Sequence, residues 1–209
     1  MSRSWGLLLV VPRRPAELQS MRTIDKTYAD PLTLVWLHAA AQMGMRVERS
    51  AEVNASWDGA GVLTIGTPET LDPDDSLAQM ILHETCHALV EGPGCERLLD
   101  WGLVNAPDKK VHEHACLRLQ AALADTVGMR AFFAATTMFR PYYDALPAAP
   151  LADDGDPAVS LATAAWGRAT RGPWAKPLQE ALQRTAQIAR ALDGVTSPDA
   201  LWHGQGLTN

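Results

Sequence analysis

The sequence predicts an α+β protein, and three observations support this class. Asp-Pro pairs predict helix starts, because the aspartate side chain can cap a helix and proline suits its first position. These pairs are Asp30-Pro31, Asp72-Pro73 and Asp156-Pro157. Segments 45–57 and 61–67 are rich in Val, Ile, Thr and Trp and are separated by a turn-forming DGA, which predicts a β-hairpin. After Gly128 only helix and loop patterns follow, so helices should gather against a small sheet.

The predicted helices follow in order along the chain. The first covers 32–44 and is closed by Gly44. The second opens at Asp72-Pro73, with Asp74 and Asp75 in its first turn, where the helix dipole favours negative charge, and it stops at Gly92. Further helices are predicted at 111–126, 129–139, 158–170 and 177–192, and the apolar run 5–12 reads as a buried strand.

Composition limits the protein class and its partners. The 209 residues are 47% hydrophobic and 20% charged, which is typical of a globular protein. We predict a single domain over 1–209, with a motif-bearing core at about 30–125 and a helical part at about 129–209. A net charge of −6 without a basic run argues against nucleic acid as a partner. The run 5–12 is too short to cross a membrane, and three cysteines suggest reduced thiols, so we expect a cytoplasmic protein.

The predicted helix 73–91 contains the pattern His83-Glu84-Thr85-Cys86-His87. Residues four apart lie on one face of a helix, so the two imidazoles can bind one ion. Glu84 is rotated by about 100° from His83, which suits a general base beside a metal-activated water. The pattern predicts a Zn²⁺ site with Glu84 as its base, against the simpler alternative of two histidines packed at a helix end.

A catalytic zinc needs a third protein ligand, and helix 111–126 offers candidates. On a helical wheel, His114 shares an arc with Arg118 and Asp125, which we interpret as a solvent face. Glu113 falls on the inward arc, together with His112, Cys116 and Gln120. An inward carboxylate must be paired or bound to a metal, so Glu113 is the predicted third ligand. His112 is the alternative ligand, and an ordinary core histidine is at least as good an interpretation of it.

These residues carry a resemblance to a known family. The HETCH pattern, followed across a loop by Glu113 in a helix reading EHACLRLQAAL, resembles the gluzincins and especially the compact ImmA/IrrE-like metallopeptidases over about residues 30–125. The resemblance implies a zincin-like fold, with a small sheet packed on the HExxH helix and on a following ligand helix. It implies that His83, His87 and Glu113 bind Zn²⁺, that Glu84 is the catalytic base, and that the substrate is a peptide or protein.

Two functional alternatives remain from the residues. One is a zincin-like binding or regulatory module that keeps a structural metal closed by four protein ligands. The other is a redox or metal protein in which cysteines are the ligands, although no CxxC pair supports it. The three cysteines concerned are Cys86, Cys95 and Cys116. Small buried residues that allow close helix packing are the favoured interpretation of Cys86 and Cys116.

Several further polar residues are weaker candidates. Glu91 follows His87 by four and can orient an imidazole, and Asp100 invites the same interpretation, although solvent-exposed acids are the favoured one. The candidates for a donor to a tetrahedral oxyanion are Tyr142, Tyr143 and His203. Segment 61–67 is a candidate free strand edge for an extended peptide.

Overall fold

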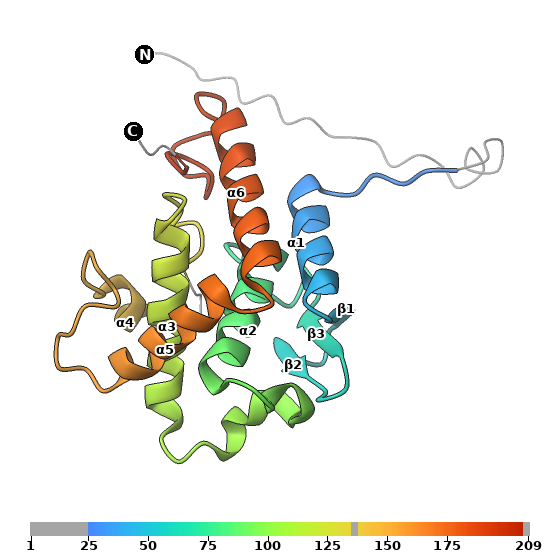
Figure 1. Cartoon of the computed structure of the whole chain (residues 1–209). Coiled ribbons are helices and arrows are strands. Elements are labelled where there is room, and N and C mark those ends of the chain that lie inside the picture. Colours follow the sequence, from blue (N-terminus) through green and yellow to red (C-terminus); the bar gives the residue numbers. More distant parts are fainter. Residues whose placement is uncertain (1–24, 135–137, 207–209) are drawn as a thin grey trace.

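The computed structural model describes residues 25–134 and 138–206 and has a mixed α+β fold, as the sequence predicts (Figure 1). The strand expected at 5–12 lies outside the described residues. The α-helices are α1 (Pro31–Gln42), α2 (Leu77–Glu91), α3 (Lys109–Asp125), α4 (Arg140–Asp144), α5 (Ala158–Arg171) and α6 (Ala175–Ala191). Two 3₁₀ segments, η2 (Cys95–Arg97) and η3 (Leu99–Asn105), connect α2 to α3. No described helix combines the length and apolar character needed to cross a membrane.

The sheet has three strands rather than the two that we predicted. Segment 45–57 is split into β1 (Arg46–Ser50) and β2 (Ala55–Trp57), and the third strand is β3 (Val62–Gly66). The strand order is β1-β3-β2, with β1 parallel and β2 antiparallel to β3. The predicted hairpin is therefore β2–β3, and the bend at 51–54 takes β1 to the other side of β3.

The central position of β3 corrects one expectation. Segment 61–67 is not a free edge, because β3 is paired on both sides. The free edges belong to β1 and β2. Strand β1 carries charged, largely exposed side chains, which discourage further pairing. Strand β2 is the edge that lies next to η3.

Two of the three predicted helix starts are confirmed. Asp30 accepts a hydrogen bond from the backbone N–H of Thr33 at 2.7 Å, and Pro31 opens α1. Asp156 accepts from the backbone N–H of Ala158 at 2.8 Å, where α5 begins. In both cases the carboxylate satisfies a backbone donor that has no partner within the helix.

The third predicted start is wrong, since α2 begins at Leu77 rather than at Asp72-Pro73. Ser76 is its N-cap and forms a capping box with Gln79, whose side chain accepts from the Ser76 N–H at 2.6 Å. Asp72 and Asp75 instead close a turn before the helix. A serine with glutamine three places later satisfies two free backbone donors, whereas an Asp-Pro pair satisfies one.

Replacement of Ser76 by Ala is expected to lower the free energy of unfolding by about 1 kcal/mol, because the helix loses its side-chain cap. Replacement of Asp72 by Ala should change it by less than about 0.5 kcal/mol, since Asp72 is exposed and lies before the helix. Urea denaturation measures both values. An equal loss in the two variants would contradict a helix start at Ser76.

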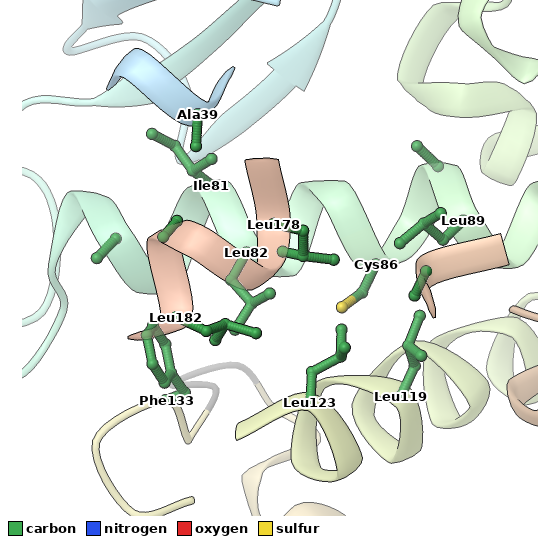
Figure 2. Packing of buried hydrophobic residues seen from close by; sticks show 14 of the residues in the cluster. Ala39, Ile81, Leu82, Cys86, Leu89, Leu119, Leu123, Phe133, Leu178 and Leu182 are labelled. Atoms are coloured by element: carbon green, nitrogen blue, oxygen red, sulfur yellow. The ribbon is translucent and has the colours of Figure 1, made fainter. Parts of the chain in front are cut away.

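Helix α2 lies at the centre of the fold and is buried along most of its length. Its side chains Leu82, Cys86 and Leu89 pack with Leu119 and Leu123 of α3 (Figure 2). The C-terminal helices α5 and α6 also contribute side chains to this core cluster. A rigid, packed α2 is what holds the motif residues in place.

Residues 129–134, the described start of the helix predicted at 129–139, do not form a regular helix. A single helical turn forms, in which the Phe133 N–H donates to the carbonyl of Met129. Side chains from elsewhere bind other backbone groups of this segment: Gln205 accepts from the Phe132 N–H and Gln120 donates to the Phe133 carbonyl. Phe132 and Phe133 are both buried, so tertiary contacts outweigh local helix propensity here.

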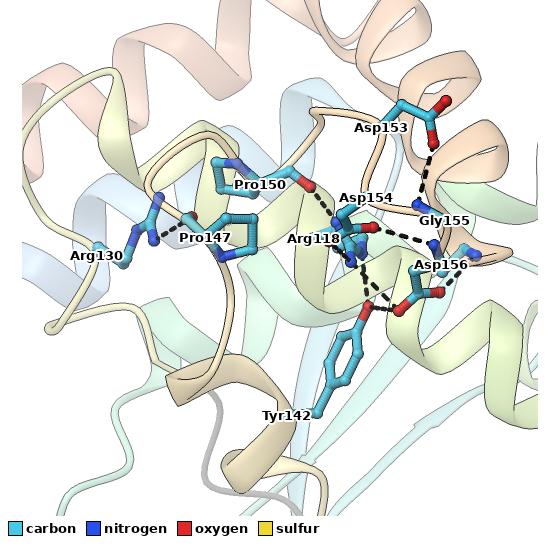
Figure 3. Close-up of polar contacts among 10 residues, drawn as sticks. Arg118, Arg130, Tyr142, Pro147, Pro150, Asp153, Asp154, Gly155 and Asp156 are labelled. Carbon is cyan, nitrogen blue, oxygen red and sulfur yellow. Dashed lines mark hydrogen bonds and ion pairs between the residues drawn. The ribbon is translucent and has the colours of Figure 1, made fainter.

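The predicted solvent face of α3 is also corrected. Arg118 is only 2% exposed, and segment 139–156 covers it (Figure 3). The guanidinium donates to Tyr142 Oη at 2.6 Å, to the Pro150 carbonyl at 2.7 Å and to the carboxylates of Asp154 and Asp156 at 2.7 and 3.3 Å. The polar residues of this face therefore bind a neighbouring segment and do not simply face solvent.

His114 and Asp125 belong to the same corrected face. The His114 ring stacks on Tyr142 with 3.5 Å between centroids, and this burial lowers the pKa of His114. Asp125 forms an ion pair with Arg130. Both side chains therefore help to attach the segment that follows α3.

Candidate metal centre

Helix α2 places His83 and His87 on one face, as the spacing of four residues requires. Both side chains are buried, and their rings meet edge to face with 4.5 Å between centroids. The two Nε2 atoms lie 3.0 Å apart. A proton or a cation must lie between two nitrogen lone pairs at this separation, since they otherwise repel each other.

Gln120 of α3 fixes the tautomer of His83. Its amide nitrogen donates to the Phe133 carbonyl at 2.5 Å, so its oxygen faces His83. That oxygen lies 2.9 Å from Nδ1 of His83, which must therefore carry the ring proton. The lone pair of a neutral His83 is then on Nε2, directed at His87. An outer partner of this kind is typical of a histidine that binds a metal.

His87 is neutral at ordinary pH. Burial, and next the neighbouring His83, lower its pKa well below the usual value. Its Nδ1 is buried and has no hydrogen-bond partner among the described residues. The neutral ring keeps a nitrogen available for a metal, but its second nitrogen lacks the orienting partner that His83 has.

The carboxylate of Glu113 on α3 approaches Nε2 of His87. Its Oε2 lies 3.6 Å from Nε2 of His87, and its side chain is mostly buried. Burial raises the pKa of Glu113, His83 opposes this shift, and Glu84 adds to it. The inward position predicted from the helical wheel brings this carboxylate to the two histidines.

These separations can be compared with the geometry of zinc. Ligand atoms about 2.0–2.1 Å from a tetrahedral zinc lie about 3.3 Å from one another. The observed separations are 3.0 Å between the two Nε2 atoms and 3.6 Å between Nε2 of His87 and Oε2 of Glu113. The pairs His83–His87 and His87–Glu113 thus fit a zinc ion in type and spacing, and a cleft remains open beside them. Glu113 does not belong to a described group whose ligand atoms all lie within 4.8 Å of one another, so its carboxylate has to move towards His83 to complete the site.

Cys116 provides a competing set of donors. Among the described residues, one group of at least three such side chains has ligand atoms within 4.8 Å of one another: His83, His87 and Cys116. The Cys116 sulfur, however, lies 3.7 Å from Nδ1 of His83, the nitrogen that Gln120 engages. Its thiol donates to the His83 carbonyl, and burial raises its pKa well above the usual value. We therefore favour Glu113 over Cys116.

Glu84 is 8% exposed and is held by a residue of η3. The indole N–H of Trp101 donates to Glu84 Oε2 at 2.9 Å. Burial raises the pKa of Glu84 to about 7, although the bond from Trp101 opposes this shift and Asp100 adds to it. A carboxyl group with this pKa can both accept and return a proton near neutral pH.

A cleft of about 350 Å³ opens over these side chains. His83, Glu84, His87 and Glu113 form its polar floor. Its walls are mainly apolar and come from η3, from Met80 of α2 and from the region before α4, and the start of β2 forms one rim. A mostly apolar cleft with a few convergent polar groups is typical of a site that binds a substrate.

A second cavity of about 510 Å³ lies at the other end of α2. Apolar side chains such as Trp57, Leu89 and Trp174 line it, together with Arg168. The Arg168 guanidinium donates to the carbonyls of Leu89 and Val90 and so caps the end of α2. Its size exceeds that of the first cleft, but the convergent donors are in the first.

The weaker candidates lie elsewhere or have structural partners. His112 Nδ1 is 2.7 Å from Glu91 Oε1, so these two residues pair with each other. Tyr142 donates to Asp156 and Tyr143 to the carbonyl of Arg130.

The oxyanion donors that we considered are not among the side chains lining the cleft, and neither is Cys95. The donors in question are Tyr142, Tyr143 and His203. Cys95 instead donates to the Ala88 carbonyl at 3.3 Å, and burial raises the pKa of its thiol to about 11. Cys86 contacts Cys116 within the helix packing. Cys95 and Cys116 are therefore protonated core residues, which gives no support to a centre with three cysteine ligands.

Two residues of the centre were not recognised from the sequence. Gln120 was noted only as inward-facing, and Trp101 was not singled out. An inward glutamine four places after Cys116 is a signal for a buried polar partner. No local pattern indicates that Trp101 reaches Glu84, because this contact depends on the path of η3.

The chain matches no model of a known protein family, no curated protein and no solved structure. Any assignment of function therefore depends on the geometry of this centre.

Proposed function

We propose that this protein is a zinc-dependent peptidase with a zincin-like arrangement of its HExxH helix. His83, His87 and Glu113 hold the metal, and Glu84 is the general base. The observation that carries the proposal is the convergence of two Nε2 atoms 3.0 Å apart, with the His83 proton held on the opposite nitrogen by Gln120. Glu113 at 3.6 Å adds the negative charge that favours a divalent cation over a shared proton.

A zinc ion held by these residues would supply a Lewis acid and would lower the pKa of a bound water to about 7. The chain supplies the proton transfers. Glu84 lines the cleft beside the metal ligands and accepts a proton from the attacking water, then returns it to the leaving amine. The nearly neutral pKa of Glu84, raised to about 7 by its burial, suits both transfers.

The edge of β2 offers a way to bind the substrate backbone. The backbone carbonyl of Asn54 accepts from the Gly66 N–H, and the backbone N–H of Asp58 donates to the Val62 carbonyl. The backbone groups of these two residues therefore face β3. Ala55, by the alternation of an antiparallel strand, directs its N–H and carbonyl away from β3. Ala55 lines the cleft, so an extended peptide can pair with it and cross the polar floor.

Replacement of Glu84 by Gln tests this proposal. Zinc-loaded wild type should cleave an unstructured protein such as casein, and the Gln variant should be slower by about 10³-fold, because the amide cannot accept the proton. The variant should still bind one zinc, as measured by metal analysis, since Glu84 is not among the proposed ligands.

The matched control is Glu91→Gln, which changes an acid of the same helix that pairs with His112. It should keep both zinc and hydrolysis. Unchanged hydrolysis in the Glu84 variant would contradict the role of Glu84 as general base. A wild-type protein that binds no zinc would contradict the proposed metal site.

A second candidate is a binding or regulatory module with a structural metal. The group of His83, His87 and Cys116 favours it, because all three side chains are buried. A structural site is closed by four protein ligands, whereas a catalytic site leaves one position to solvent. The cleft over His83 and His87 makes the peptidase the better supported of the two.

A further inference from the structure

The turn Asp100–Gly102 within η3 has an unusual backbone. Three consecutive residues lie in the left-handed region, with φ of 45° at Asp100, 58° at Trp101 and 85° at Gly102. Asp100 and Trp101 are the only described residues other than glycine with positive φ. This conformation is unfavourable for a tryptophan, so surrounding contacts must hold it, and such strain is frequent at functional sites.

Contacts with β2 hold the turn. Asp100 Oδ1 accepts from the Ser56 hydroxyl and from the Trp57 N–H, both at 3.0 Å. The indole of Trp101 stacks on that of Trp57, with 4.1 Å between centroids and 9° between planes. Trp101 is 2% exposed. The side chain of Trp101 is therefore fixed from two directions, by its backbone and by its stacking partner.

This arrangement directs the indole N–H of Trp101 at the carboxylate of Glu84. Trp101 has one hydrogen-bond donor on its side chain, and it is directed at Glu84 Oε2 at 2.9 Å. A glutamate has three side-chain torsions, so without a partner its carboxylate would sample several orientations. With one oxygen held by the indole, the carboxylate is restricted to one position over the cleft.

We propose that Trp101 is a positioning residue for Glu84, and that the strained turn at Asp100–Gly102 exists to aim its indole N–H at that carboxylate. The proposal rests on the proposed function of Glu84 as general base. Asp100 has the supporting role: it ties the turn to β2, the same strand whose edge faces the cleft.

The contact itself can be tested without turnover, by indole ¹H–¹⁵N NMR of the full chain. The variants Trp101→Phe and Trp57→Phe assign the indole resonances of these two tryptophans. In Glu84→Ala, the Trp101 indole proton should move upfield and exchange with solvent at least about tenfold faster. The Trp57 indole, which donates to the Glu96 carbonyl, should be unchanged. An unmoved Trp101 resonance would overturn the proposal.

The kinetic test compares the two phenylalanine variants, which remove the same N–H from either partner of the stack. Trp101→Phe should lower kcat about 10- to 100-fold with KM and zinc content nearly unchanged, because a misplaced catalytic group slows the reaction without weakening binding. Trp57→Phe keeps an aromatic ring to stack on Trp101 and leaves the Trp101 N–H in place, so it should stay within about threefold of wild type. Equal losses in the two variants would show a structural effect only and would overturn the positioning role.

Variants of Asp100 provide a second test that leaves the indole intact. Asp100→Ala should reproduce the loss in kcat, because the turn is released from Ser56 and Trp57. Asp100→Asn should retain most of the activity, since asparagine keeps the accepting oxygen and tolerates a left-handed backbone. If zinc-loaded wild type cleaves no peptide, the proposed function fails, and the NMR result still shows whether Trp101 holds Glu84.

Discussion

Zinc affinity is expected to fall by at least about 100-fold when Glu113 is replaced by Gln, and to stay within about threefold when Cys116 is replaced by Ser. Loss of a residue that only orients a ligand typically costs 10- to 100-fold in affinity, so loss of a charged ligand should cost at least as much. Competition with a chromophoric chelator measures both constants.

The two variants separate the two sets of donors that the structure offers. Glu113 reaches the side of His87 that faces the cleft, whereas Cys116 lies at Nδ1 of His83. A metal bound between Cys116 and Nδ1 of His83 would have to break the hydrogen bond between His83 and Gln120. It would also have to displace the proton of the Cys116 thiol, whose pKa is raised. The site with Glu113 requires neither change.

Glu91→Gln is the control for a general loss of negative charge near the centre. Glu91 is mostly buried and pairs with His112, so its removal should leave zinc affinity within about threefold. The reverse pattern, with weak binding in Cys116→Ser and normal binding in Glu113→Gln, would identify a His-His-Cys centre. The structural module would then replace the peptidase as the favoured function.

The local signals of the sequence predicted helices better than the sheet. Capping by Asp30 and the stop at Gly92 depend on residues close in sequence, so they could be predicted. The start of α2 was misplaced because Ser76 and Gln79 form a stronger cap than Asp72-Pro73. Strand order could not be predicted, because no local turn signal indicates that β1 passes β2 and pairs in parallel with β3.

The candidate site divides in the same way. His83, Glu84 and His87 share one helix, so their relative positions follow from helical spacing. Glu113 was placed near them by its inward direction on α3, and the structure brings it to His87. Trp101 could not be predicted, because its approach to Glu84 depends on a left-handed backbone in η3.

Arg118 shows how a helical wheel can mislead. A wheel distinguishes polar from apolar arcs, and a polar arc normally faces solvent. Here segment 139–156 supplies two carboxylates, a tyrosine hydroxyl and a carbonyl to the guanidinium, so the buried charge has four partners (Figure 3). Burial alone would lower the pKa of Arg118, but these hydrogen bonds outweigh it and raise the pKa.

Replacement of Arg118 by Met is therefore expected to lower the free energy of unfolding by about 3 kcal/mol. Removal of one partner of a buried ion pair typically costs 3–5 kcal/mol, because the other charges remain without compensation. The lower end of this range applies, since the Asp154 side chain is 36% exposed and keeps contact with water. Asp156 is less exposed and should contribute more of the loss.

Urea denaturation at neutral pH measures this loss, and Arg130→Met is the matched control. Arg130 pairs with Asp125 near the surface, so its replacement should cost less than about 1 kcal/mol. Equal losses in the two variants would contradict the buried role of Arg118.

The contribution of Arg118 to the free energy of unfolding should decrease as the pH falls below the usual pKa of aspartate. The hydrogen bond from Arg118 lowers the pKa of Asp154. Burial raises the pKa of Asp156, but hydrogen bonds from Ala158, Tyr142 and Arg118 outweigh burial. The net shift of the Asp156 pKa is therefore also downward. A group whose pKa is lower in the folded state stabilises the protein above its usual pKa of 3.8 and loses this effect as the pH falls through the folded value. The difference between wild type and Arg118→Met should therefore be constant from pH 5 to 7 and shrink below about pH 4. A difference that persists unchanged at pH 2.5 would show that Arg118 stabilises α3 through packing of its aliphatic part and not through these carboxylates.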